Sequence, residues 1–148
     1  MPFQVILDTD VLVAASRSNR GASFELLRLF ETGDTRWEWN ISTALLIEYE
    51  AVLKREQHRR GRDFAEVDRL LDDVTARGNR HAIFFLSRPH LNDPDDEFIL
   101  ELALAAGAHY IVTHNRGDFR DAERFGVRVV RPGEFLSILQ ASHERPDR

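Results

Sequence analysis

An acidic pair interrupts an apolar segment at residues 5–13, and this feature constrains the fold more than any other. Residues 5–7 have the continuous apolar character of a strand buried on both faces, which is typical of parallel sheets. Asp8 follows at once, and Thr9 or Asp10 is suited to cap the next helix. Ligands of open α/β sheets bind at the carboxyl ends of strands, so Asp8 is expected at a binding site. A lone aspartate here is also common in turns, so this interpretation requires partners elsewhere in the chain.

Apolar runs of strand length alternate with segments of helical periodicity along the 148 residues. This alternation predicts one domain with a three-layer α/β/α sandwich and a mainly parallel sheet of about five strands. The predicted strands are residues 3–7, 37–41, 82–86, 110–113 and 127–131. The predicted helices are residues 11–15, 22–31, 43–55, 64–77, 94–106, 121–125 and 132–139. We expect the domain to span residues 1–141 and the polar tail, 142–148, to be frayed.

The composition excludes several classes of protein. With 43% hydrophobic residues the chain has enough apolar content for a core, and the absence of cysteine excludes disulfides, thiolate zinc sites and cysteine nucleophiles. The formal charge of −5 argues against a non-specific nucleic-acid binder, unless acids are clustered to hold metal ions. No apolar run approaches the roughly 20 residues that span a bilayer, and no signal-peptide pattern is present. We therefore expect a cytoplasmic protein that does not bind membranes.

Glu48 lies on a predicted helix beside its apolar stripe, because Leu45 and Val52 are its neighbours at i−3 and i+4. Removing a carboxylate from water costs free energy unless the carboxylate finds a partner. A metal ion would be such a partner, and so would an arginine at the boundary of the core.

Four acids lie within residues 93–97, at the start of another predicted helix. Helix N-termini favour acids, but capping accounts for only one or two of them. Asp93 and Asp96 share a face of this helix, and apolar residues that should pack on the sheet follow Asp96. We expect Asp96 to lie toward the interior, with Asp93 supporting it.

The predicted strand at residues 110–113 ends in a polar loop that contains Thr113, Asn115 and Asp118. In a parallel sheet the carboxyl end of this strand lies at the same edge as Asp8. Asn, Gly and Asp also dominate ordinary turns, so the loop alone does not establish a site.

The combined acids are Asp8, Glu48, Asp96 and Asp118, and all of them are hard oxygen donors. Such donors suit Mg²⁺ or Mn²⁺ rather than zinc. Sites of this kind usually act on phosphates, because the ion activates a water and offsets charge on the phosphoryl oxygens.

Five short motifs, in their order and spacing, resemble the PIN-domain nucleases, especially the toxin components of bacterial toxin–antitoxin pairs (VapC-like). The motifs are residues 6–12 (Ile-Leu-Asp-Thr-Asp-Val-Leu), Ser42 with residues 46–49 (Leu-Ile-Glu-Tyr), and residues 93–96, 102–108 and 110–119. The resemblance covers nearly the whole chain.

The resemblance implies a ribonuclease that hydrolyses single-stranded RNA with one or two Mg²⁺ or Mn²⁺ ions. Asp8, Glu48 and Asp96 would be the catalytic ligands. Many relatives have aspartate at the position of Asn115, so Asp118 is the candidate for a fourth acid. The supporting residues would be Thr9, Asp93, Thr113 and Asn115. Family members commonly form homodimers and are inhibited by a cognate antitoxin protein.

Three arginines in loops predicted to flank the site, Arg17, Arg20 and Arg116, are candidate phosphate contacts, although any one of them is more often a solvated surface residue. Two alternative functions stay open. Asp8 and Asp10 imitate the acid pair of haloacid-dehalogenase-type phosphatases, whose lysine could only be Lys54, the single lysine of the chain. The chain could also be a PIN-fold binding module with little catalysis.

Overall fold

The computed structural model of the protein describes residues 1–83 and 94–144. These residues contain a five-stranded sheet with the order β3-β2-β1-β4-β5, in which every neighbouring pair is parallel. The strands are β1 (Phe3–Leu7), β2 (Trp37–Ser42), β3 (Asn79–His81), β4 (Tyr110–Val112) and β5 (Arg128–Val130). The predicted fold class is confirmed.

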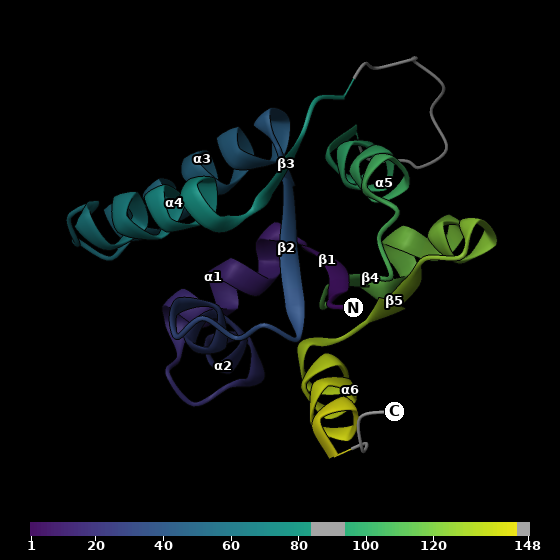
Figure 1. Ribbon diagram of the computed structural model, residues 1–148. Helices are drawn as coiled ribbons and strands as arrows, with labels where there is room; N and C mark the ends of the chain where they lie inside the picture. Colours follow the sequence, from purple (N-terminus) through teal and green to yellow (C-terminus); the bar gives the residue numbers. More distant parts are fainter. Residues whose placement is uncertain (84–93, 145–148) are drawn as a thin grey trace.

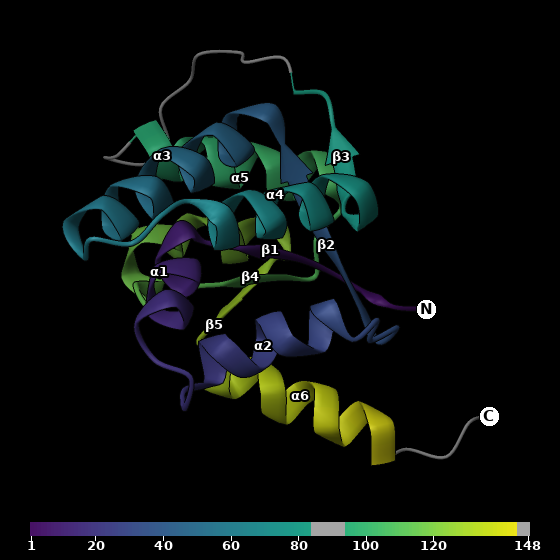
Figure 2. The ribbon, with the colours of Figure 1, turned by 90° about the vertical axis from the view of Figure 1, so that its left-hand side faces the viewer.

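Helices cover both faces of the sheet and make three layers (Figure 1). One face carries α1 (Thr9–Arg17), α2 (Ala22–Glu31), α3 (Thr43–Arg59), α4 (Ala65–Arg77) and α6 (Pro132–Glu144). The other face carries α5 (Pro94–Ala106) and the 3₁₀ segment η1 (Arg116–Phe125). In Figure 2, α2 and α6 lie side by side below the sheet. No helix within residues 1–83 and 94–144 combines the length and the apolar character that crossing a membrane requires.

The core contains an aromatic cluster on the face covered by α2, α3 and α6. Trp37 and Trp39 project to this face and contact the rings of Phe30, Tyr49 and Phe135. The alternation of Trp37, Trp39 and Ile41 with Glu38 and Asn40 is typical of a half-exposed strand, but α5 covers the opposite face and buries nearly the whole of β2. Edge-to-face contacts between such rings stabilise a core beyond the burial of their area.

The third strand lies earlier than predicted. The apolar residues 82–86 suggested a strand, but β3 is Asn79–His81, residues 82 and 83 lie outside it, and residues 84–86 lie outside the described part. Polar contacts explain the shift: His81 Nε2 lies 2.8 Å from Asn40 Oδ1, and Asn79 Nδ2 donates to Gln4 Oε1 at 3.1 Å. A buried amide needs partners of this kind.

The sheet changes direction of growth at β1. The chain first adds β2 and β3 on one side of β1, and later adds β4 and β5 on the other side. The carboxyl ends of β1 and β4 therefore lie at a topological switch point, where open α/β sheets bind their ligands. Asp8 and Thr113 directly follow these two strands.

Candidate functional site

Asp8 forms the junction between β1 and α1. It is the N-cap of α1, and its Oδ1 accepts a hydrogen bond from the Thr9 backbone N–H at 2.8 Å. The sequence had suggested Thr9 or Asp10 as the cap, which was wrong by one or two residues. This bond uses Oδ1, so the other carboxylate oxygen of Asp8, Oδ2, is available to Thr113 directly after β4.

Thr113 holds Asp8 from the neighbouring strand. Its buried hydroxyl donates to Asp8 Oδ2 at 2.7 Å and accepts the backbone N–H of Asn115 at 3.0 Å. The Asp8 backbone N–H donates to the Val112 carbonyl at 2.9 Å, which continues the β1–β4 ladder to the site. These bonds join the ends of two strands that are distant in sequence.

Asp10 fixes the loop that follows β4. Its carboxylate accepts the backbone N–H of His114 and the side-chain amide of Asn115, each at 3.1 Å from Oδ2. Asp10 therefore does not cap α1 but binds the loop after β4. Asn115 is thereby held at the site by its side chain as well as by its backbone.

Glu48 approaches from α3. Its Oε2 accepts a hydrogen bond from the hydroxyl of Thr9, the first residue of α1. The next residue, Tyr49, is fully buried, and its hydroxyl donates to the carbonyl of Leu7 at the end of β1. Burial raises the pKa of the Tyr49 phenol well above its ordinary value, so the hydroxyl keeps its proton. The start of α3 is thus tied to the end of β1.

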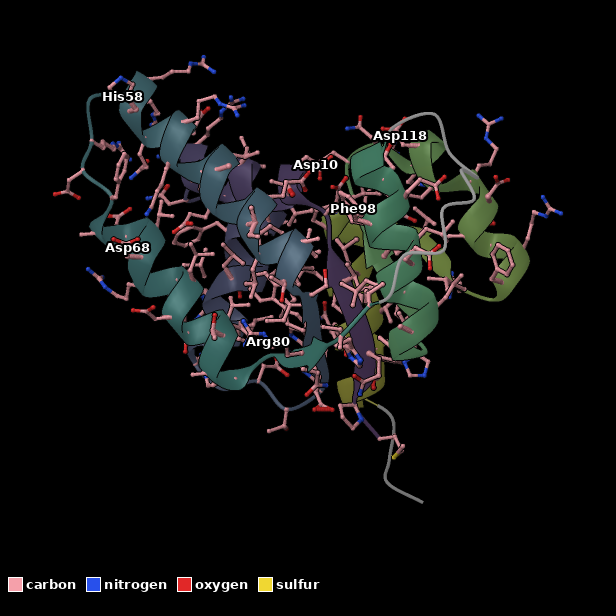
Figure 3. The ribbon with its side chains drawn as sticks, turned by 90° about the horizontal axis from the view of Figure 1, so that it is seen from above. Asp10, His58, Asp68, Arg80, Phe98 and Asp118 are labelled. Atoms are coloured by element: carbon pink, nitrogen blue, oxygen red, sulfur yellow. The ribbon has the colours of Figure 1, made fainter. Side chains whose placement is uncertain are left out.

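An open pocket of about 560 Å³ lies over these groups, and we call it the acidic pocket. Four of its lining acids are those predicted from the sequence, Asp8, Glu48, Asp96 and Asp118. In Figure 3, Asp10 and Asp118 lie at the same end of the molecule, beside the start of α5. The other lining residues are Thr9, Asp10, Val13, Ala14, Arg17, Val52, His114 and Asn115.

The acidic pocket disfavours negative charge on Asp8. Burial, together with the nearby charges of Asp10 and Asp96, raises the pKa of Asp8 from 3.8 to about 7, although hydrogen bonds from Thr113 and Thr9 oppose this. Burial likewise raises the pKa of Asp10. Carboxylates that repel one another in a partly desolvated pocket favour the binding of a cation.

The donor chemistry of the pocket fits a hard divalent cation. Carboxylates that follow β1 or lie on α3, α5 and η1 line it together with the amide of Asn115, and all of them offer oxygen atoms. As placed, no three Asp, Glu or His side chains within residues 1–83 and 94–144 are close enough to hold one ion together. Asp8 and Glu48 are instead held by the hydroxyls of Thr113 and Thr9, so a bound ion would require these carboxylates to shift toward it.

The three arginines predicted to contact phosphate differ in position. Arg17 lines the acidic pocket, but its guanidinium binds Glu56 at 2.7 Å and 3.1 Å. Arg116 binds Glu134 at 3.2 Å and does not line this pocket, nor does Arg20, an exposed loop residue. Their role as substrate contacts stays a prediction.

Asp93, predicted as a supporting residue, lies outside the described residues. His114 lines the pocket, with Nε2 3.1 Å from Ser23 Oγ, and sequence reasoning had assigned it no role. Its position directly after the predicted strand at residues 110–113 was the signal that could have marked it.

Lys54 does not support the phosphatase alternative. Its ammonium lies 3.1 Å from both Glu50 and Asp68, and it does not line the acidic pocket. Asp10, the second acid of that alternative, is occupied by the loop after β4.

Comparison with known proteins shows to which family the chain belongs. Curated protein sequences give no match. Among solved structures, a PilT N-terminus domain protein from the hyperthermophilic archaeon Sulfolobus solfataricus P2 matches with 13% identity and a TM-score of 0.43, covering 99% of this chain and 98% of that chain. The family model described as PIN domain matches residues 4–117, which include Asp8, Glu48 and Asp96. The chain therefore belongs to the PIN-domain family, whose members are generally nucleases that use divalent metal ions.

Proposed function

We propose that the protein is a metal-dependent endoribonuclease that hydrolyses phosphodiester bonds in single-stranded RNA. The observation that carries this proposal is the meeting of Asp8, Glu48, Asp96 and Asp118 in one pocket at the switch point of the sheet. These acids come from distant parts of the chain. The raised pKa of Asp8 indicates that a cation bound in the pocket would stabilise its ionised form. Membership of a family of nucleases supports the same assignment.

Asp8, Glu48 and Asp96 would hold Mg²⁺ or Mn²⁺, and Asp118 would be the fourth acid. When bound, the ion would lower the pKa of a water and offset charge on the phosphate oxygens. The chain's own residues prepare this site. Thr113 orients Asp8, Thr9 orients Glu48, and Asp10 fixes the loop that carries Asn115. Partners of this kind hold metal ligands in place.

Substitution of the acids tests the proposal. Losing a group that merely supports a metal ligand costs about 10- to 100-fold, so Asp8→Asn and Asp96→Asn should each lower Mn²⁺-dependent cleavage of single-stranded RNA more than ~100-fold. Glu48→Gln should do the same. Glu50→Gln is its matched control, since exposed Glu50 lies on the same helix and pairs with Lys54. Cleavage by Asp8→Asn or Asp96→Asn at the wild-type rate would exclude the metal site.

Calorimetric titration with Mn²⁺ separates the nuclease from the alternative of a PIN-fold binding module. The nuclease proposal expects binding of one or two ions that Asp8→Asn abolishes. RNA binding without any Mn²⁺ binding or cleavage would favour the module. The presence of Asn115 and the separation of the acids give this alternative its support.

We also propose that this ribonuclease is the toxin of a toxin–antitoxin pair, with a homodimeric form and a cognate antitoxin protein as inhibitor. The support is the resemblance of the five sequence motifs to VapC-like toxins. Expression of the protein in bacteria should arrest growth, and Asp8→Asn should remove the arrest. Equal growth with either form would contradict the toxin role, and light scattering would test the dimer.

A further inference from the structure

A second pocket, also about 560 Å³ in volume, lies next to the acidic pocket and differs from it in charge. It is formed where the α1–α2 loop, the loop after β4 and the start of α6 meet. Its polar lining residues are Ser18, Ser23, His114, Arg116, Arg131 and Glu134. We call it the cationic pocket.

The two arginines of the cationic pocket are not equivalent. Arg116 is bound to Glu134 at 3.2 Å, and Glu134 also accepts the backbone N–H of Arg131 at 3.2 Å. The exposed guanidinium of Arg131 has no ion pair or hydrogen bond within residues 1–83 and 94–144. Glu134 is therefore neutralised by Arg116, and Arg131 leaves an uncompensated positive charge at the pocket.

The backbone of α2 adds to this positive potential. Gly21 is the N-cap of α2 and provides no side-chain cap, so the first N–H groups of the helix have no partner from the cap. Gly21, Ala22 and Ser23 all line the cationic pocket. The N-terminus of a helix carries partial positive charge and favours anions.

The two pockets share a wall. Ala14 and His114 line both of them, and His114 is fixed there by its backbone bond to Asp10 and by Ser23. A chain of linked phosphates with one group at the acids can therefore continue past Ala14 and His114 into the pocket that Arg131 lines. An RNA strand has this form, and arginine binds its phosphates through paired N–H donors.

We propose that the cationic pocket binds a backbone phosphate of the RNA strand next to the bond that is cleaved in the acidic pocket, with Arg131 as the main contact. This inference rests on the proposed ribonuclease function and names the path of its substrate. Arg131 was not among the candidates chosen from the sequence, and it differs from Arg17 and Arg116 because each of those two is paired with a glutamate. No sequence pattern distinguishes Arg131 from the other arginines of the chain.

Binding without cleavage tests the cationic pocket separately from catalysis. A fluorescein-labelled single-stranded RNA is titrated in EDTA over a series of salt concentrations, and its anisotropy is followed. Loss of one phosphate contact should reduce the slope of log K against log salt by about 0.7, so Arg131→Gln should show this change and weaker binding. Arg80→Gln is the matched control, since Arg80 is also exposed and without a partner among the described residues, and lies away from Asp10 in Figure 3.

The outcomes separate this inference from the proposed function. A lower slope for Arg131→Gln alone supports the cationic pocket, whether or not the wild type cleaves RNA with Mn²⁺. An unchanged slope, an equal effect of Arg80→Gln, or no RNA binding by the wild type would overturn it. If cleavage occurs, Arg131→Gln should raise KM much more than it lowers kcat, whereas Asp8→Asn should abolish kcat.

Discussion

Each end of helix α1 contacts a carboxylate, and the two carboxylates differ in whether a positive charge of the protein balances them. At the N-terminus, Asp8 accepts hydrogen bonds from neutral donors, Thr9 and Thr113, and its pKa rises to about 7. At the C-terminus, Arg17 binds Glu56, and this hydrogen bond holds the pKa of Glu56 below its ordinary value. The carboxylate of Glu56 is compensated within the protein. Asp8 is oriented but not compensated, which is the condition that a cation from solution can satisfy.

The largest expected effect concerns Asp8 without metal. The rise from 3.8 to about 7 means that the folded state resists ionisation of Asp8. One pKa unit corresponds to about 1.4 kcal/mol, so ionised Asp8 costs up to roughly 4 kcal/mol of stability. This cost is absent below the unfolded pKa, grows as the pH rises toward the folded pKa, and is constant above it. Asparagine avoids the cost but retains one acceptor in place of two, a loss of about 1 kcal/mol.

Urea denaturation in EDTA should therefore show Asp8→Asn to be more stable than the wild type by about 3 kcal/mol at pH 8, and by much less near pH 4. Mn²⁺ should reverse the order at pH 8, because a ligand that binds the folded state stabilises it. A variant that is less stable than the wild type in EDTA at pH 8 would show that Asp8 is compensated by the protein itself.

The next prediction concerns whether the orientation of Asp8 by the neutral donor Thr113 strengthens metal binding. Thr113→Val replaces the buried hydroxyl by a methyl group of similar size and removes its bonds to Asp8 and Asn115. Mn²⁺ affinity, measured by calorimetry, should fall about 10- to 100-fold, as for other groups that support metal ligands. Thr113→Ser keeps the hydroxyl and should retain most of the affinity. If Thr113→Val bound Mn²⁺ with the affinity of the wild type, Thr113 would contribute to packing only and not to metal binding.

Local patterns were sufficient to predict where most of the acids lie. Asp8 was predicted from the end of an apolar strand, Glu48 from its place beside the apolar stripe of a helix, and Asp96 from the start of a helix. Each prediction used only the sequence pattern of one element. The same reasoning predicted the parallel sheet. It missed residues 79–81, which form β3 and have no apolar run of their own; Asn79 and His81 instead contact Gln4 and Asn40.

The groups that support the acids could not be predicted in the same way. Asp10 and His114 are 104 positions apart, and no local pattern indicates that a backbone N–H of one meets the carboxylate of the other. The same holds for the cationic pocket, which requires the α1–α2 loop, the loop after β4 and the start of α6 to meet. Whether an arginine is free or bound depends on such distant contacts, so the sequence could not separate Arg131 from Arg17.

The smallest effect is expected at the C-terminal end of α1. Arg17 is exposed, and the nearly buried Glu56 also pairs with Arg59 at 3.5 Å, so Glu56 keeps one cationic partner when Arg17 is lost. Arg17→Gln should therefore lower the urea midpoint slightly at pH 7 and leave Mn²⁺-dependent cleavage close to the wild-type rate. Since the pKa of Glu56 is lowered, its contribution is present above the unfolded pKa and is lost as the pH falls, so the difference should disappear in acid. The sign of the stability change is opposite to that for Asp8. Removing Arg17 lowers stability only at a pH where Glu56 is ionised, whereas removing the carboxylate of Asp8 raises stability only at a pH where Asp8 is ionised in the wild type. A large loss of cleavage in Arg17→Gln, with Glu56→Gln unaffected, would instead place Arg17 on the substrate.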